Sequence, residues 1–184
     1  MKASFATVCC LALSGCLGYH IGPVKPYYLR DVHSLAVPTF KNRTLVPRIE
    51  VLVTDTVIKQ LQQDGTFQIA SGDNADATLS GEIYRIVRLP ARSVSGNVLA
   101  TSEFALTLSV KYSLIGKNGE QLAPPNEVVG TTSFFVSNNS NNTNIINNNN
   151  NITNGDVTTD ERQALLLATE DLATRLVSQI SEGW

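Results

Sequence analysis

The sequence is poor in the side chains that most catalytic and metal sites need. Its 184 residues include two histidines and three cysteines, which leaves little material for a zinc site or a disulfide framework. No G-x-S-x-G, H-E-x-x-H, C-x-x-C or P-loop pattern occurs. His20 and His33 are each better explained as structural or exposed residues than as a general base. We therefore expect no enzyme, no metal ion and no cofactor other than a covalent lipid.

The chain also lacks an excess of basic charge. Lys and Arg number 14 against 16 Asp and Glu, for a formal net charge of −2 and an isoelectric point near 5.6. A nucleic-acid-binding domain normally has a basic footprint, so we expect no nucleic-acid partner. Hydrophobic residues make up 42% of the chain, which is enough for one core and typical of a single folded domain.

Long apolar runs are absent, but a short one opens the chain. Lys2 precedes an apolar stretch from Ala3 to Leu13, which is too short to span a bilayer as a helix of roughly 20 residues. The stretch ends in Leu13-Ser14-Gly15-Cys16, which resembles a bacterial lipobox. We expect residues 1–15 to be a removed signal peptide and Cys16 to be lipidated, the alternative being an ordinary signal peptide with a chance cysteine.

A lipid on Cys16 would anchor the protein to a membrane. The next residue is Leu17 rather than Asp, so the usual signal for inner-membrane retention is missing. By resemblance to sorted lipoproteins, we expect the periplasmic face of the outer membrane. Residues 16–30 are interpreted as the lipidated N-terminus and a tether, although tyrosines within them could instead pack on the domain.

Apolar periodicity predicts the elements of the remaining domain, residues 31–184. A helix is expected from Pro47 to Asp64, with Gly65 as a left-handed C-cap. A second helix should run from Thr158 to about Ser181, because Thr158 and Glu161 form a capping box. Strands are expected at 33–40, 66–70, 77–89, 103–114 and 127–136, with turns at 42–44, 71–74 and 116–119 and a loop at 93–97.

Two of these strand segments carry further information. Residues 103–114 alternate almost perfectly between apolar and polar side chains, as in a strand with one core face and one polar face. In the segment 77–89, Arg85 interrupts an apolar face. Either a β-bulge lies near residues 84–86 or Arg85 points to a special site.

The order of elements predicts an α+β fold. We expect a two-layer sandwich in which a mixed, mostly antiparallel sheet of four to five strands carries two helices on one face. Between the last strand and the last helix, residues 137–156 are rich in Asn. Such a segment cannot bury a core, so we expect a disordered loop.

The candidate ligand-binding residues are four cations. Arg85, Arg88 and Arg92 fall on or just after one predicted strand, and Lys111 lies on the next. Arg88 and Arg92 share parity, so the neighbouring strand could bring Lys111 close to them. Such a cluster would suit phosphate or carboxylate groups. The alternative is that these are ordinary solvated strand charges.

Several short motifs, in this order, resemble the lipopolysaccharide-assembly lipoproteins of the LptE family. Each motif is weak alone, but together they cover nearly the whole chain after Cys16. The Asn-rich stretch departs from the family pattern. The motifs are the lipobox with Gly18-Tyr19-His20 and the residues 35–44, 52–54, 62–67, 75–83, 102–104 and 168–173.

The resemblance implies a partner and a ligand. Proteins of this family support assembly of LptD, the large outer-membrane β-barrel that delivers lipopolysaccharide, and plug its lumen. They can also bind lipopolysaccharide, which on this view would meet Arg85, Arg88, Arg92 and Lys111. The rival hypothesis is an envelope lipoprotein that scaffolds a secretion pore or activates peptidoglycan synthesis, because residues 37–43 also resemble the first strand of such proteins.

Overall fold

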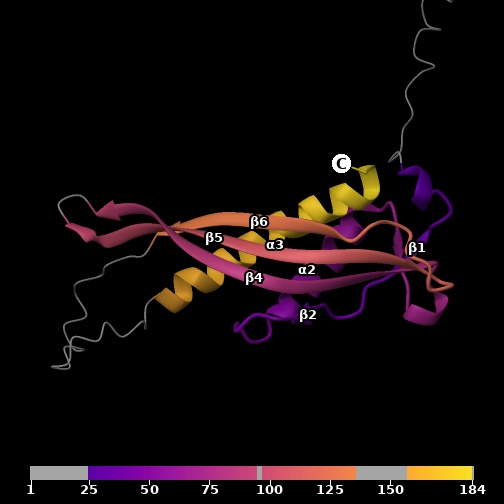
Figure 1. The fold of residues 1–184 in the computed structure, drawn as a ribbon, viewed down its shortest axis with the longest axis horizontal. Helices are drawn as coiled ribbons and strands as arrows, with labels where there is room; N and C mark the ends of the chain where they lie inside the picture. The colour runs from indigo at the N-terminus through magenta and orange to yellow at the C-terminus, as the bar shows by residue number, and fades with distance from the viewer. Residues whose placement is uncertain (1–24, 95–96, 136–156, 184) are drawn as a thin grey trace, which may run out of the picture.

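The computed structural model describes residues 25–94, 97–135 and 157–183 (Figure 1). Two long helices and a curled sheet account for most of them. The elements in chain order are η2 (Tyr27–Leu29), β1 (Ser34–Ala36), β2 (Lys41–Asn42), α2 (Ile49–Asp64), β3 (Gln68–Ile69), η3 (Gly72–Asn74), β4 (Ala77–Val94), β5 (Asn97–Gly116), β6 (Asn126–Phe135) and α3 (Val157–Glu182).

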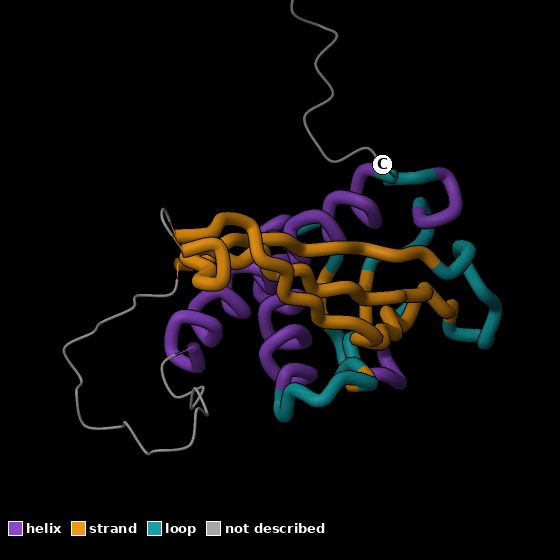
Figure 2. Tube along the Cα trace, turned by 60° about the vertical axis from the view of Figure 1, so that its left-hand side comes forward, coloured by secondary structure: helices purple, strands orange, loops and turns teal. Residues whose placement is uncertain are grey.

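The sheet has six strands in the order β3-β1-β4-β5-β6, and β2 pairs with β4 farther along that strand. The short strands β1, β2 and β3 pair in parallel, whereas β4, β5 and β6 form an antiparallel meander. Both helices cover the same face of the sheet, and the other face is open (Figure 2). The expected α+β sandwich is confirmed, with β2 as a strand beyond the expected four to five.

The core lies between the two helices and the face of the sheet that they cover. From β5 it receives alternate residues, among them Leu106, Leu108 and Val110, which are 0% exposed. From α3 it receives Leu172 and Leu176, also 0% exposed. This is the period-two strand predicted from the sequence packed against the period-3.6 face of a helix.

Helix α3 approaches β6 closely because Gly130 has no side chain. A Cβ at that position would lie 2.1 Å from the carbonyl oxygen of Ala168. The Asp171 carboxylate of α3 also accepts a hydrogen bond from the backbone N–H of Thr131, at 2.9 Å. The helix therefore covers part of the edge strand and pairs one of its outward donors, which blunts that edge.

Helix α2 ends where the sequence predicts and begins two residues later than expected. Gly65 adopts the left-handed conformation with φ of 73° and donates to the carbonyl of Leu61, as a C-capping glycine does. At the other end, Arg48 has φ of 63° and is the one described non-glycine residue with positive φ. The left-handed turn at Arg48 delays the start of the helix to Ile49.

The bounds of several elements differ from expectation. The predicted strand 33–40 is shorter than expected, since β1 ends at Ala36 before Pro38, which cannot donate to a ladder. The short strand β2 lies beyond it and overlaps the predicted turn at 42–44. The hairpin of β4 and β5 continues to Val94 and Asn97, beyond the predicted ends. Helix α3 begins at Val157, one residue before the predicted cap. The predicted turn at Gly119 has the expected positive φ, 79°.

The bulge predicted near Arg85 is present. The pairing of β4 with β5 slips between Ile83 and Arg85, so that one extra residue, Tyr84, is accommodated. Before the slip, odd-numbered residues of β4 face the helices; after it, Ile86 lies opposite the core residue Leu108. Arg85 thereby turns away from the core.

Two polar contacts fix the end of the sheet that carries β1. The Asp76 carboxylate accepts hydrogen bonds from the backbone N–H of His33 and of Ser34 and from the Ser34 hydroxyl, each at 2.9 Å. These donors favour the charged form and hold the pKa of Asp76 below its ordinary value. Tyr112 donates to Gln179 of α3 at 2.9 Å, and burial raises the pKa of Tyr112 to about 12.

Some predicted features lie outside the described residues. These are the signal peptide at 1–15, the lipidation site Cys16, the tether up to residue 24 and the Asn-rich segment 137–156. No helix within the described ranges is long and apolar enough to cross a membrane.

Candidate functional site: the open face of the sheet

The open face of the sheet carries a row of alternating charges. In the strand register, Lys41 of β2 lies beside Glu82 of β4, Glu82 beside Lys111 of β5, and Lys111 beside Glu127 of β6. Opposite charges on directly paired residues stabilise a sheet and fix its register. The row therefore presents a polar face in which each cation has a carboxylate as its neighbour.

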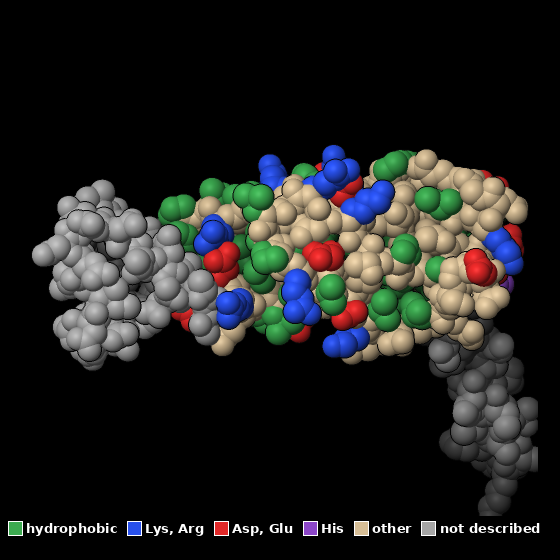
Figure 3. Space-filling model, turned by 90° about the horizontal axis from the view of Figure 1, so that it is seen from below, with side chains coloured by type: hydrophobic (Ala, Val, Ile, Leu, Met, Phe, Trp, Pro, Cys, Tyr) green, Lys and Arg blue, Asp and Glu red, His purple; other side chains and the backbone are tan. Residues whose placement is uncertain are grey.

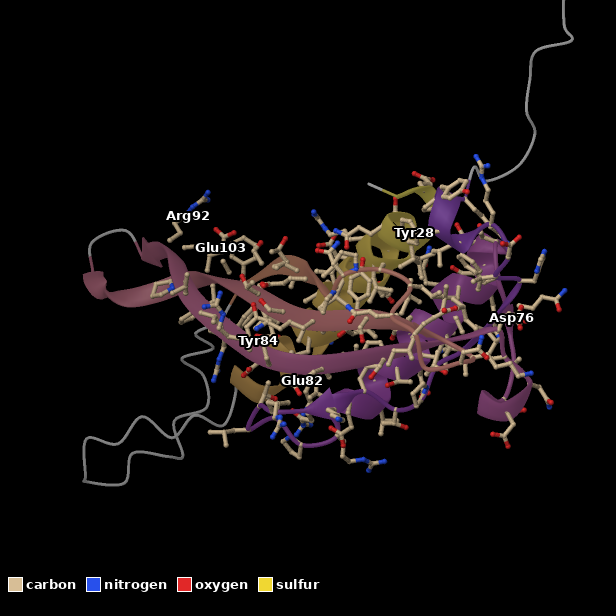
Figure 4. All side chains as sticks on the ribbon, turned by 45° about the vertical axis from the view of Figure 1, so that its right-hand side comes forward. Tyr28, Asp76, Glu82, Tyr84, Arg92 and Glu103 are labelled. Carbon is tan, nitrogen blue, oxygen red and sulfur yellow. The ribbon has the colours of Figure 1, made fainter. Side chains whose placement is uncertain are left out.

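Tyr84 lies at the centre of this face. Tyr84 is the extra residue of the bulge, and its hydroxyl donates to the carboxylate of Glu127 two strands away. The Lys111 ammonium lies 4.8 Å from the ring centroid of Tyr84, and the Arg85 guanidinium lies 6.0 Å from it. The bond to Glu127 raises the pKa of Tyr84. Figure 4 shows Tyr84 and Glu82 on the middle of β4.

The structure brings together only two of the four predicted cations. Arg85 and Lys111 share the ring of Tyr84. Arg88 lies opposite the core-facing Leu106 and forms an ion pair with Glu161 of α3 at 2.8 Å. The four residues therefore do not form one cluster.

Arg92 is separated from Arg88 by a second slip in the ladder. The register shifts between Pro90 and Arg92, so the parity that Arg88 and Arg92 share in the sequence is lost. Arg92 pairs with Glu103, and their side chains approach to 3.6 Å. In Figure 4 this pair lies toward the end of the hairpin, away from Tyr84.

The basic residues of β4 have a structural explanation as well. Beyond Ile83, β4 pairs only with β5, because β1 and β2 end their pairing at residues 78 and 83. This part of β4 is an edge strand, and it contains Pro90, charged side chains and four register shifts. These are the features with which sheet proteins prevent edge-to-edge association.

A shallow recess adjoins the charge row. It has a volume of about 250 Å³ and is lined by Lys41, Ser80, Gly81, Glu82, Lys111, Tyr112, Ser113 and Pro125. The two lysines of the recess flank its single carboxylate, Glu82, so its lining carries one more positive than negative charge. Sequence reasoning missed Tyr84 and the two glutamates of the row, because only the strand register places them beside Lys111.

In the described part of the chain, no group of three or more His, Cys, Asp or Glu residues is placed to hold a metal ion. Viewed from below, basic and acidic side chains are interspersed with apolar ones (Figure 3). The face in that view is therefore mixed in charge, in contrast to the single-sign surface typical of a nucleic-acid-binding protein.

Several solved bacterial structures are similar to this chain at low identity. A minor lipoprotein from Acinetobacter baumannii is 14% identical, with 82% of this chain and 94% of that chain covered and a TM-score of 0.49. Lipoprotein B from Nitrosomonas europaea is 12% identical, with 82% and 83% covered and a TM-score of 0.49. The PelC dodecamer from Paraburkholderia phytofirmans is 15% identical, with 86% and 93% covered and a TM-score of 0.46. Similarities at this level give no information on partners or ligands.

The family comparison is more informative than these structural similarities. No curated protein matches the chain. The family model described as LptE, lipopolysaccharide-assembly, matches residues 32–180, which include every strand of the sheet, helix α2 and nearly all of α3. The chain therefore belongs to the LptE family of lipopolysaccharide-assembly proteins.

Proposed function

We propose that this protein is an outer-membrane lipoprotein that supports the assembly of an LptD-like β-barrel and plugs its lumen. The anchor would be the lipid on Cys16, and the role requires no catalysis. The observation that carries the proposal is the family match over residues 32–180. The open face of the sheet supports it, because a row of alternating charges presents paired polar groups to a partner.

The physical argument concerns the inside of a barrel. The interior of a large outer-membrane barrel is polar, whereas its outer wall is apolar. A plug must offer polar groups to that interior and must not bury an unpaired charge there. The row from Lys41 to Glu127 meets both conditions, because each cation already has a carboxylate beside it.

Co-purification with a matched pair of variants tests the proposal. A tag placed after Trp184 would recover the protein from envelopes in mild detergent, and we expect a stoichiometric barrel of LptD size. Lys111→Glu places three carboxylates side by side and should reduce barrel recovery at least tenfold. Lys59→Glu, at an exposed position of α2, should leave it unchanged. Recovery of the protein alone, or of a peptidoglycan synthase, would refute the plug function.

Lipopolysaccharide binding is the second part of the proposal. Arg85 and Lys111 are the two predicted cations that lie on the same ring, so together they can meet a phosphate. Arg88 and Arg92 would first have to leave their partners Glu161 and Glu103. We expect Arg85→Gln with Lys111→Gln to weaken binding of purified lipopolysaccharide about tenfold, and Arg88→Gln to have little effect. Equal binding by all variants would exclude these residues as the site.

A further inference from the structure

One leucine side chain in the loop between β2 and α2 is fully exposed to solvent. Leu45 has a relative exposure of 102%, the highest of any large hydrophobic side chain in the described ranges. Single exposed apolar residues are common and need no special explanation. Leu45 is different because the loop around it is fixed, so the side chain cannot turn inward to bury itself.

Asn42 organises this loop through both ends of its side-chain amide. Its Oδ1 accepts hydrogen bonds from the backbone N–H and the hydroxyl of Thr44, both at 2.8 Å. Its Nδ2 donates to the carbonyl of Val46 and to the carboxylate of Glu50, both at 2.9 Å. The residues on either side of Leu45 are therefore both held by the same side chain.

Two further contacts hold the loop at its base. The Arg43 backbone N–H donates to the carbonyl of Ile83 at 2.8 Å, and Val46 packs against the core. At the far end, Arg48 adopts a left-handed conformation, which a residue with a Cβ takes only at an energetic cost. The sequence thus keeps a costly turn and a fully hydrated leucine, and a rigid loop of this kind loses little freedom when it binds.

The charges next to Leu45 in the sequence are of one sign, although Glu50 and Glu82 contact the loop from α2 and β4. Arg43 and Arg48 flank Leu45, and no acidic residue occurs between residues 41 and 49. The side chain of Arg43 is 65% exposed even though it contacts Glu82. Arginine is enriched among the residues that dominate protein–protein binding.

We propose that Leu45 inserts into an apolar pocket rimmed by carboxylates on the protein partner of this lipoprotein. The inference rests on the proposed function in taking the barrel subunit as that partner. Such a pocket would remove the exposed side chain of Leu45 from water, and its carboxylates would meet Arg43 and Arg48. The contact lies on the loop after β2, at the lower edge of the molecule in Figure 1, and adds to the open face of the sheet.

The dissociation constant of the lipoprotein from the purified barrel tests this contact. Leu45→Ser should raise it at least tenfold, because burial of a leucine is lost. The thermal unfolding midpoint should stay at the wild-type value, since Leu45 contributes nothing to the core. Leu167→Ser is the matched control: Leu167 is 52% exposed on α3, and its replacement should leave the dissociation constant unchanged.

A second variant tests the arginines beside Leu45. Arg48→Gly removes the guanidinium and suits the left-handed conformation, so it cannot weaken binding by unfolding the loop. We expect a several-fold weaker complex and a weaker dependence of the dissociation constant on salt. An unchanged dissociation constant together with an unchanged salt dependence would show that Arg48 lies outside the interface, and would refute its contact with carboxylates of the partner.

A photo-crosslinking residue at position 45 identifies what the loop touches in intact envelopes. An adduct with the barrel supports the proposal, whereas an adduct only with lipid or with a second copy of this chain overturns it. If the wild-type protein binds the barrel and Leu45→Ser binds it with the same dissociation constant, this inference is overturned but the proposed function is preserved. Absence of barrel binding by the wild-type protein defeats the proposed function, and the partner assignment fails with it.

Discussion

The two halves of β4 are built differently although they form one continuous strand. Between Ala77 and Ile83 the strand pairs with β5 on one side and with β1 and β2 at its two ends on the other, and it sends Leu79, 0% exposed, into the core. From Tyr84 onward it pairs only with β5, and Leu89 is 58% exposed. In Figure 1 the far part of the β4–β5 hairpin extends beyond α3.

The bulge at Tyr84 marks the boundary between these halves. Before it, the alternation of β4 serves the core, and after it, the same strand carries the charges and the proline of an exposed edge. In this half β4 has one free edge, although residues 103–109 of β5 continue the sheet to β6, and an exposed side chain there removes little apolar surface from water. We infer that the first half supplies stability and that the second half can be altered with little effect on folding.

Truncation of one leucine in each half gives the largest expected contrast. Leu79→Ala should lower the free energy of unfolding by about 2–5 kcal/mol, because it leaves a cavity in the core. Leu89→Ala should change it by less than about 0.5 kcal/mol, since the side chain is largely hydrated. Chemical denaturation of the two variants measures both values. Similar losses would show that the two halves fold as one equally packed unit.

A pair of tyrosine replacements sharpens the comparison with a smaller effect. Tyr112→Phe removes a hydrogen bond to Gln179 from a buried side chain and should cost about 1 kcal/mol of unfolding free energy. Tyr84→Phe removes the bond to Glu127 on the open face and should cost less than about 0.5 kcal/mol. Equal costs in denaturant titrations would argue against the contrast.

The raised pKa of Tyr112 adds a pH signature to this pair. The folded value is about 12 against an ordinary 10.0, so the stability linked to the neutral phenol is complete below pH 10. It is lost as the pH rises from 10 toward 12, because the unfolded chain ionises first. Wild-type protein should therefore lose its advantage over Tyr112→Phe in that window, as thermal melts at alkaline pH would show.

Asp76 tests how the first half of β4 is joined to β1. Asp76→Ala removes three hydrogen bonds to His33 and Ser34 and should lower the melting temperature, by less than Tyr112→Phe does. Because the folded pKa is depressed, this contribution is present above the ordinary value of 3.8. It is lost as the pH falls through the depressed pKa, so the gap between wild type and variant should close in acid. Asp73→Ala, in the neighbouring turn, is the control and should show no such pH dependence.

The smallest expected effect concerns the ion pair that joins the second half of β4 to α3. Arg88 and Glu161 have side chains that are 49% and 16% exposed, and partly exposed pairs contribute about 0.2–1 kcal/mol. A double-mutant cycle with Arg88→Ala and Glu161→Ala should give a coupling energy in this range. A coupling well above it would mean that the hairpin is held to α3 far more firmly than its exposure indicates.

Local chemistry made much of the fold predictable. The alternation in residues 103–114 marked β5, Gly65 marked the end of α2, and the interruption at Arg85 marked the bulge. The ends of the hairpin were not predictable, because Pro90, Ala91 and Arg92 are exposed and interrupt the apolar alternation. Apolar alternation arises where one face of a strand is buried, so an exposed stretch of strand does not show it.

The candidate site was less predictable than the fold. The sequence singled out cations, but it could not count the residues that a bulge inserts. One slip at Tyr84 and another before Arg92 moved Arg88 and Arg92 away from Lys111. The partners of Lys111 come from two other strands, and only the register aligns Glu82 and Glu127 with it.

The alternating row on the open face also bears on how fast a partner can find this surface. Charges that alternate in sign over neighbouring strands cancel at a distance, so this face exerts little attraction beyond direct contact. Association through it should therefore proceed at the ordinary rate for proteins without electrostatic steering, about 10⁵–10⁶ M⁻¹s⁻¹. For such a surface, the encounter rate depends on the local concentration of the partner. Confinement of both proteins to one membrane would raise that concentration and so speed their encounter without electrostatic attraction.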